Sequence, residues 1–311
     1  MKNRRQFLAT TGGTAVALAT SSCGTDDDKG AGPTGDLIDA HVHVWTPDTT
    51  KYPLAEGYDQ SAMKPPSFTP EELFAECHPH GVSRIVLIQM SFYKYDNSYM
   101  VDVMKAHPGV FGGVAIVDEN EPGVMDRMNA LKAEGVRGFR LYANKENAEK
   151  WQNSQGMLEM WANGAGENLA MCLLADPDAL PSAIAMCERF PETPVVVDHF
   201  ARIGMRGAVD QAELDQLLKL AEFEHTYVKV SAFYALGSKV APYYDLRDMI
   251  QQLRDAYGAE RLMWATDCPY QVQNGHTYEA SIALIRDHCD FLSAEEKTTI
   301  LRGTAEKVFF S

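Results

Sequence analysis

Runs of apolar and β-branched residues alternate along the chain with segments whose apolar residues recur at helical spacing. The runs are nearly continuous, which is typical of parallel strands that are buried on both faces. They cover residues 37–44, 84–90, 110–118, 136–142, 169–175, 194–200, 226–233 and 261–269. A helical segment follows nearly every one of these eight runs. This order predicts an α/β fold, a (β/α)8 (TIM) barrel.

An open, doubly wound sheet is the alternative that the same pattern allows. Its nucleotide-binding versions carry a glycine-rich turn directly after the first strand. The residues that follow 37–44 contain no such turn, so the pattern favours the barrel.

The first 35 residues differ in composition from the rest of the chain. Arg4 and Arg5 precede a stretch of apolar and small residues, 7–19, that is too short to span a membrane. The pattern resembles a twin-arginine export signal, and Cys23 is a candidate for lipid attachment. We therefore expect residues 1–35 to be an export signal and flexible linker, and residues 36–311 to form the barrel. The predicted location is the periplasm, either free or as a membrane-anchored lipoprotein.

The charge of the chain limits its partners. Its formal net charge is −15, and nucleic acids and anionic membranes need a positive surface. We therefore expect a small-molecule substrate and no nucleic acid. Beyond Cys23 there are five cysteines, an odd number without a C-x-x-C pair, so the sequence predicts neither a disulfide framework nor a zinc knuckle.

Polar side chains stand at the carboxyl ends of the predicted strands, where barrel enzymes place their active sites. His41 and His43 are two residues apart, so in an extended strand they point to the same side. That pair alone is equally compatible with two structural histidines. Further polar residues at strand ends are Gln89, Arg140, Asp198, His199, Lys229, Tyr234 and Asp267. Because these ends meet at one mouth of a barrel, the residues are expected to surround a single pocket.

The ordered motifs resemble those of the amidohydrolase superfamily, in its amidohydrolase-2 branch. They are "DAHVHVW" (39–45), "VRGFRLY" (136–142), "VVVDHFAR" (195–202), "YVKVSAFY" (227–234), "RLMWATDCPY" (261–270) and "ILRGTAEKVF" (300–309). Within that branch, "VKVSAFY" and "ATDCPY" look most like the lactonase group. The resemblance implies a hydrolase that opens lactones of sugar acids or of carboxylated acids such as pyrone dicarboxylate.

The resemblance also implies a metal centre. His41, His43, His199 and Asp267 match the positions that hold a single divalent metal, with zinc as the first candidate. Some lactonases of this group work without metal, so the histidines are alternatively donors to the carbonyl oxygen of the substrate. In either case Asp267 is expected to be the general base that activates water.

Four further residues are expected to bind substrate. Arg140 and Lys229 suit a carboxylate or hydroxyl groups, and guanidinium groups bind carboxylates in a bidentate manner. Gln89 and Tyr234 are candidates for contacts with substrate hydroxyls.

Other activities remain open on the same scaffold. A metal-dependent decarboxylase of the superfamily would carry a further histidine after the seventh strand, and residues 231–244 contain none. An amide hydrolase is a second alternative. A catalytically inactive binding lipoprotein is a third, disfavoured by the complete polar set at His41, His43, His199 and Asp267.

Overall fold

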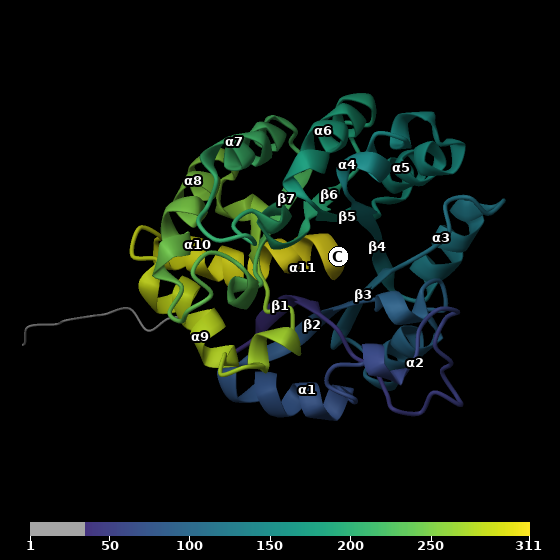
Figure 1. Cartoon of the computed structure of the whole chain (residues 1–311), viewed down its shortest axis with the longest axis horizontal. Coiled ribbons are helices and arrows are strands. Elements are labelled where there is room, and N and C mark those ends of the chain that lie inside the picture. The colour runs from purple at the N-terminus through teal and green to yellow at the C-terminus, as the bar shows by residue number, and fades with distance from the viewer. Residues whose placement is uncertain (1–34) are drawn as a thin grey trace, which may run out of the picture. The chain divides into compact units, whose positions relative to one another are not determined.

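The computed structural model describes residues 35–311; residues 1–34, with the predicted export signal and Cys23, lie outside the described part. Eight parallel strands form one sheet in chain order, which confirms the predicted barrel (Figure 1). The strands are β1 (Leu37–Val42), β2 (Val82–Ile88), β3 (Phe111–Ala115), β4 (Val136–Ala143), β5 (Ala170–Ala175), β6 (Val195–Val197), β7 (Thr226–Val230) and β8 (Leu262–Trp264).

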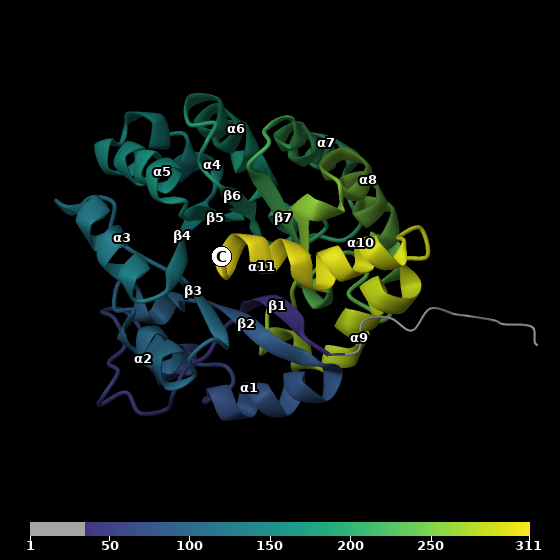
Figure 2. The ribbon, with the colours of Figure 1, turned by 180° about the vertical axis from the view of Figure 1, so that it is seen from behind.

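Helices surround the strands in both views (Figures 1 and 2). They are α1 (Pro70–Cys77), α2 (Ser98–Ala106), α3 (Val124–Ala133), α4 (Lys145–Ala148), α5 (Gln155–Glu167), α6 (Leu180–Arg189), α7 (Gln211–Lys219), α8 (Arg247–Tyr257), α9 (Tyr278–Ala283), α10 (Ala294–Thr298) and α11 (Thr304–Phe309). The start of α1 shows how local sequence sets a boundary. Thr69 and Glu72 form a capping box around Pro70, whose missing N–H costs nothing in the first turn.

The strands bury side chains on both faces, which is why their sequences are almost wholly apolar. In β2, Val86 and Ile88 belong to the cluster inside the barrel, whereas Ile85 and Leu87 belong to the cluster between strands and helices. This alternation follows from the two-residue period of a strand.

The first strand departs from strict alternation. A β-bulge lies between Asp39 and Val42, where three residues of β1 advance against two residues of β2. Ile38 and Ala40 belong to the inner cluster, yet His41 also reaches the interior, where it contacts Lys229 of β7. Bulges re-aim side chains in this way. The bulge therefore delivers His41 to the barrel axis.

The seam between β1 and β8 is closed largely by a side chain. Among residues 35–311 the backbone bridge at this seam pairs Val42 of β1 with Cys268, which lies beyond the end of β8. Beside it, the buried Asp39 carboxylate accepts hydrogen bonds from the Thr266 backbone and hydroxyl and from the Tyr278 hydroxyl. Burial raises the pKa of Asp39 to about 6, although the hydrogen bonds from Thr266 and Tyr278 oppose that shift. Asp39 thus links β1 to the residues after β8, where the two strands form no continuous ladder of backbone hydrogen bonds.

One end of the barrel is covered by the last helix. In both views α11 lies across the middle of the ring (Figures 1 and 2). Ala305 and Phe309 of α11 join the inner cluster with Ile38 and Val86. This packing leaves the opposite end, where the strands terminate, as the open mouth.

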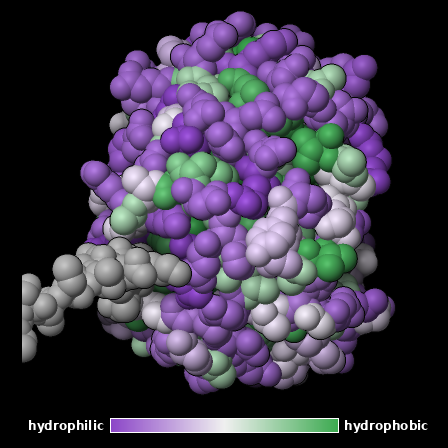
Figure 3. Space-filling model, turned by 90° about the vertical axis from the view of Figure 1, so that its left-hand side faces the viewer, coloured by the Kyte–Doolittle hydropathy of each residue, from purple (hydrophilic) through white to green (hydrophobic). Residues whose placement is uncertain are grey.

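The surface in Figure 3 is mainly hydrophilic, and its apolar side chains form small, separate groups. Among residues 35–311 no helix has the length and apolar character needed to cross a membrane. The five described cysteines are buried and free: Cys77, Cys172, Cys187, Cys268 and Cys289.

Candidate active site

An unusual turn positions the site residues that follow β6. His199, Phe200, Ala201 and Arg202 all have left-handed backbone angles, with φ between 52° and 58°. A left-handed residue other than glycine costs about 1–2 kcal/mol, and such strain clusters at functional sites. Asp267 after β8 shares this conformation, with φ of 69°. This backbone brings the side chains of His199 and Asp267 within 3.8 Å of each other at the barrel mouth.

Four side-chain atoms converge at the bottom of the mouth: the Nε2 atoms of His41, His43 and His199, and Oδ1 of Asp267. The carboxylate oxygen lies 3.5 Å from His41, 3.2 Å from His43 and 3.8 Å from His199. His41 Nε2 and His43 Nε2 are 3.3 Å apart. All four side chains are nearly or fully buried. The structure therefore brings together the four residues that the sequence analysis assigned to one centre.

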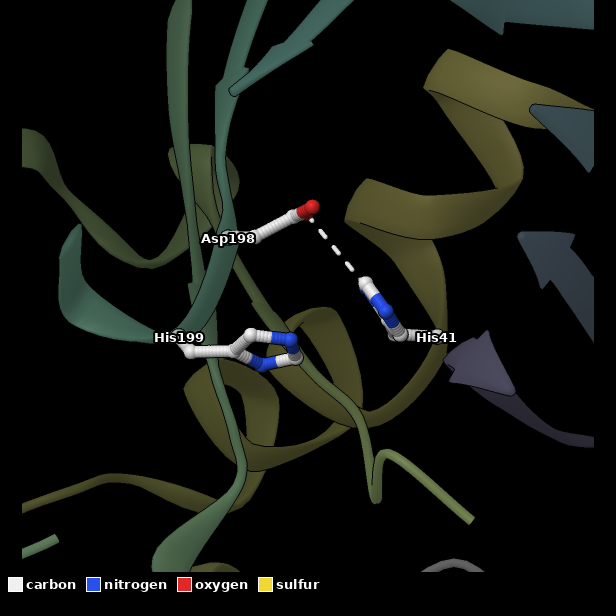
Figure 4. Close-up of side chains that lie close together, drawn as sticks. All are labelled: His41, Asp198 and His199. Carbon is white, nitrogen blue, oxygen red and sulfur yellow. Dashed lines mark ion pairs between the residues drawn. The ribbon is translucent and has the colours of Figure 1, made fainter. Parts of the chain in front are cut away.

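The donor atoms and their spacing fit a zinc ion. Zinc binds imidazole nitrogen and carboxylate oxygen at about 2.0–2.2 Å in a tetrahedron, which places neighbouring ligands about 3.4 Å apart. The observed separations of 3.2–3.8 Å bracket that value. The possible ligands form two groups that share His41: His41, His43 and Asp267, and His41, Asp198 and His199 (Figure 4).

Asp267 stays ionised in this setting. Burial alone would raise its pKa, but His199, His43 and His41 outweigh burial and hold the pKa well below its usual range. Tyr234 donates a hydrogen bond of 2.6 Å to the second oxygen, Oδ2. The remaining oxygen, Oδ1, therefore faces the histidines with its charge available to accept a proton.

The histidines are held by partners behind them. Nδ1 of His43 lies 2.8 Å from the carbonyl oxygen of Ile88, and Nδ1 of His199 lies 2.8 Å from Oγ of Ser231. Burial lowers the pKa of His199, and burial together with Lys229 lowers the pKa of His41. Burial therefore favours the neutral form of both rings, and the charge of Asp267 opposes this shift at His199.

Asp198, Lys229 and His41 form a fully buried group beneath the four-atom centre. Lys229 Nζ lies 3.0 Å from Asp198 Oδ1 and 3.1 Å from His41 Nδ1. In Figure 4, His41 points from the end of β1 towards Asp198 and His199, which follow β6. Lys229, followed by His41 and His199, outweighs the effect of burial on Asp198 and keeps the pKa of that carboxyl well below its usual range.

A cavity of about 300 Å³ opens above this centre. Five of the predicted site residues line it: His43, Arg140, His199, Tyr234 and Asp267. The rest of its wall consists of Met90, Ser91, Leu174, Arg202, Met205, Ala232, Ala235, Leu236 and Tyr270. A larger hollow of about 790 Å³, near Glu119 and Glu159, shares no residue with this cavity and contains no histidine.

Two predicted substrate contacts, Gln89 and Lys229, are absent from the cavity wall. The Gln89 side chain donates to the backbone oxygens of Asp96 and Lys94, and Lys229 is buried among His41 and Asp198. A long polar side chain on a barrel strand can bind other groups of the protein instead of the substrate, and the sequence does not show this. The geometry points to supporting roles for both residues.

Arg202 and Tyr270 line the cavity but were missed by the sequence analysis. Arg202 is ion-paired with Asp176, and its guanidinium lies 5.8 Å from the centre of the Tyr142 ring. Both residues occur inside the quoted motifs "VVVDHFAR" and "RLMWATDCPY". Both residues follow a strand end by a few positions, which was the available signal. The sequence does not show that the left-handed turn after β6 brings Arg202 back to the cavity.

Comparison with known proteins finds lactone-cleaving enzymes among the relatives of this chain. The chain is 26% identical over 236 residues to the 4-sulfomuconolactone hydrolase of Rhizobium radiobacter, covering 75% of each chain. It is 25% identical over 283 residues to the L-fucono-1,5-lactonase of Burkholderia ambifaria, covering 86% of this chain and 93% of the relative.

Solved structures share the fold. A putative 2-pyrone-4,6-dicarboxylic acid hydrolase from Pseudomonas putida matches with a TM-score of 0.74 and 23% identity, over 88% of this chain and 97% of the other. A zinc-bound amidohydrolase from Burkholderia multivorans matches with a TM-score of 0.71 and 20% identity, over 89% and 99%. The model of the amidohydrolase family matches residues 38–310, nearly the whole described barrel. The chain that carries these three histidines and one aspartate therefore belongs to the amidohydrolase family.

Proposed function

We propose that the protein is a hydrolase that opens a lactone of a sugar acid or of a carboxylated acid, using water activated by Asp267. The observation that carries the proposal is the ionised Asp267 carboxylate, which faces three imidazoles at the bottom of a cavity. The names of the relatives, both lactone-cleaving enzymes, support the reaction class.

The residues supply each proton transfer that the reaction needs. Asp267 takes a proton from water while the water oxygen bonds to the lactone carbonyl carbon. The carbonyl oxygen becomes an oxyanion, which an imidazole N–H of the centre stabilises. The bond between that carbon and the ring oxygen then breaks, and Asp267 returns the proton to the departing alkoxide. The product is a hydroxy acid, and no atom is left unaccounted for.

A divalent metal fits the same four residues. His41, His43 and Asp267 would hold it, His199 lies 3.8 Å from Asp267 beside them, and zinc suits these ligand types best. When bound, such an ion polarises the carbonyl group and lowers the pKa of water. Metal analysis of the purified protein, with activity measured before and after chelation, separates a metal-dependent enzyme from a metal-free one.

Arg140 is the group that we assign to a substrate carboxylate. Its side chain lines the cavity and makes one hydrogen bond, 3.2 Å long, to the backbone oxygen of Gln89. A guanidinium group with most of its donors free suits bidentate recognition of a carboxylate. Tyr234 donates its hydroxyl proton to Asp267, so it can still accept a hydrogen bond from a substrate hydroxyl group.

A panel of lactones tests the proposal. Purified protein is offered neutral sugar lactones, carboxylated lactones, aromatic carboxylic acids and simple amides, and proton release, carbon dioxide and free amine are followed. We expect proton release from at least one lactone. Carbon dioxide from aromatic acids alone would instead identify a decarboxylase, and amine release alone an amide hydrolase.

We also propose that the protein is exported by a twin-arginine signal and is periplasmic or lipid-anchored through Cys23, on the strength of Arg4 and Arg5. Cell fractionation of the unaltered chain beside Arg4→Lys/Arg5→Lys and Cys23→Ala variants tests both parts of this proposal.

A further inference from the structure

The three histidines of the centre differ in the group that contacts Nδ1, the ring nitrogen that faces away from the centre. A metal-ligating histidine almost always donates its far ring N–H to an acceptor, which leaves the near nitrogen with a free lone pair. His43 meets this condition, because the Ile88 carbonyl oxygen beside its Nδ1 can only accept. The proton of a neutral His43 ring therefore sits on Nδ1, and its Nε2 is free.

His199 meets the same condition through Ser231. The Ser231 hydroxyl lies 3.3 Å from the backbone oxygen of Lys229 and donates to it. It therefore accepts from His199 Nδ1, at 2.8 Å. The Nε2 atom of His199 is then left with its lone pair towards the centre.

His41 is arranged in the opposite way. Its Nδ1 lies 3.1 Å from the ammonium nitrogen of Lys229, a group that has donors and no acceptor. The nearest acceptor, Oδ1 of Asp198, is farther away at 3.4 Å. Among residues 35–311 neither oxygen of the Asp198 carboxylate has a hydrogen-bond partner of good geometry. Lys229 is thus the nearer partner of His41 Nδ1 and can only donate, which favours an unprotonated Nδ1 and a proton on Nε2 of the neutral ring.

This assignment gives a consistent direction to the contacts that join Lys229, His41, His43 and Ile88, while Asp267 Oδ1, 3.5 Å from His41 Nε2 and 3.2 Å from His43 Nε2, stands outside that chain. Lys229 Nζ donates to His41 Nδ1, His41 Nε2 donates to His43 Nε2 at 3.3 Å, and His43 Nδ1 donates to the Ile88 carbonyl oxygen. The alternative tautomer of His41 would place an N–H against the Lys229 ammonium and two lone pairs against each other. Because Lys229 is fully buried and its ammonium lies 5.5 Å from the centre of the Phe309 ring, it has little freedom to turn away.

We propose that Lys229 is a positioning residue that fixes His41 as a hydrogen-bond donor through Nε2, and that it thereby weakens the hold of the four-residue centre on a divalent metal. Asp198 anchors the ammonium by its charge, 3.0 Å away. The tautomer and the metal affinity do not depend on which substrate is used.

The tautomer can be read directly in the unaltered protein. Two-bond proton–nitrogen correlation spectra of the uniformly labelled, metal-free protein distinguish protonated from unprotonated ring nitrogens, and a His41→Asn variant assigns the His41 signals. We expect His41 to be protonated at Nε2, and His43 and His199 at Nδ1. A His41 ring protonated at Nδ1, or at both nitrogens, would overturn the proposal. This measurement needs no substrate and no variant of Lys229.

Zinc affinity gives a second, independent test, with variants chosen for opposite effects. Lys229→Met removes the donor, so Nδ1 of His41 can donate to Asp198, and the zinc dissociation constant should fall by about ten- to hundredfold. Ser231→Ala removes the acceptor behind His199 and should raise that constant. Both are measured by competition with a zinc-binding dye. Weakened or unchanged binding in a folded Lys229→Met protein contradicts the proposal; if that variant does not fold, the spectra of the unaltered protein decide.

Discussion

Arg140 and Arg202 line the same cavity, but only one of them has a carboxylate partner within the described chain. Arg202 is paired with Asp176, whereas Arg140 forms no ion pair. A charged hydrogen bond contributes about 1.5–3 kcal/mol when its partner is present, so the free guanidinium is the stronger candidate for binding an anionic substrate.

Substitution of Arg140 should therefore act selectively. We expect Arg140→Gln to reduce kcat/KM about ten- to hundredfold for a lactone that carries a carboxylate, mainly through KM. A neutral lactone of similar size is the matched control and should lose much less. Equal losses for both substrates in steady-state assays would show that Arg140 supports the scaffold rather than the anion.

The low pKa values of the histidines set the expected pH profile. Burial lowers the pKa of His199 and, together with Lys229, that of His41, while the histidines keep the pKa of Asp267 low. As the pH falls, the imidazoles therefore stay neutral and Asp267 stays ionised below the ordinary histidine pKa of about 6.5. We expect the acid limb of kcat/KM to lie below that value. A midpoint at 7 or higher, measured with a pH-independent coupled assay, would contradict this assignment.

The residues of the centre were predictable, but several of its supports were not. His41, His43, His199 and Asp267 fall at strand ends in a recognisable order, so their convergence followed from the barrel alone. The burial of Lys229 depends on its pairing with Asp198, and the cavity position of Arg202 depends on a left-handed turn. Neither a buried ion pair nor a left-handed turn without glycine has a marker in a single sequence.

Among the structural elements, the β1–β8 seam is the one that most directly supports the site. Asp267 N donates to the backbone oxygen of His41, and His43 N donates to that of Cys268, each at 2.9 Å. These contacts adjoin the Asp39 carboxylate that closes the seam. The positions of three of the four converging residues therefore depend on one buried side chain.

Asp39→Asn should accordingly lower both stability and activity. The amide nitrogen cannot accept a hydrogen bond, so at least one of the Thr266 and Tyr278 donors is left unpaired, at a cost of about 1–3 kcal/mol each. Denaturant unfolding followed by far-ultraviolet circular dichroism measures the loss. Tyr278→Phe, which removes only one donor, is the control and should cost less. A variant as stable as the unaltered protein would show that the seam closes without this carboxylate.

Element boundaries were predicted less well than element types. The pattern extended the sixth strand to residue 200 and the eighth to residue 269, whereas β6 ends at Val197 and β8 at Trp264. Both runs stay apolar past the strand because the following turns are also buried, so hydrophobicity does not mark the boundary. The bulge in β1 is likewise invisible in the sequence, since its residues fit an ordinary strand.

At the scale of the whole molecule, the barrel is covered at one end and open at the other. Phe309 of α11 belongs to the inner cluster and is almost fully buried. Its ring also faces the ammonium of Lys229, at 5.5 Å. The closing helix is therefore packed directly beneath the residues that support the centre.

Removing that ring should destabilise the molecule strongly. We expect Phe309→Ala to lower the free energy of unfolding by about 3–5 kcal/mol, as is typical of a buried aromatic residue. Phe310→Ala is the matched control, because Phe310 is only partly buried and lies over Arg84. Equal losses in the two variants, measured by denaturant unfolding, would mean that α11 does not cover the inner core as described.

The barrel itself followed from the sequence, because eight buried strands alternating with helices leave few arrangements that bury every strand. The family relationship was equally readable, and the match to residues 38–310 confirms it. Residues 300–309, which include α11, were recognised as a family motif. The position of α11 across the barrel end depends on long-range packing that no local pattern encodes.

The most direct test of the account is the fate of the water oxygen. The lactone that the panel identifies is hydrolysed in water enriched in oxygen-18, by the unaltered protein and by Asp267→Asn. We predict that one labelled oxygen enters the new carboxylate and none enters the new hydroxyl group, and that Asp267→Asn lowers kcat by about a hundredfold or more. Label in the hydroxyl group, or turnover by Asp267→Asn at the rate of the unaltered protein, would contradict attack on the carbonyl carbon by water that Asp267 activates.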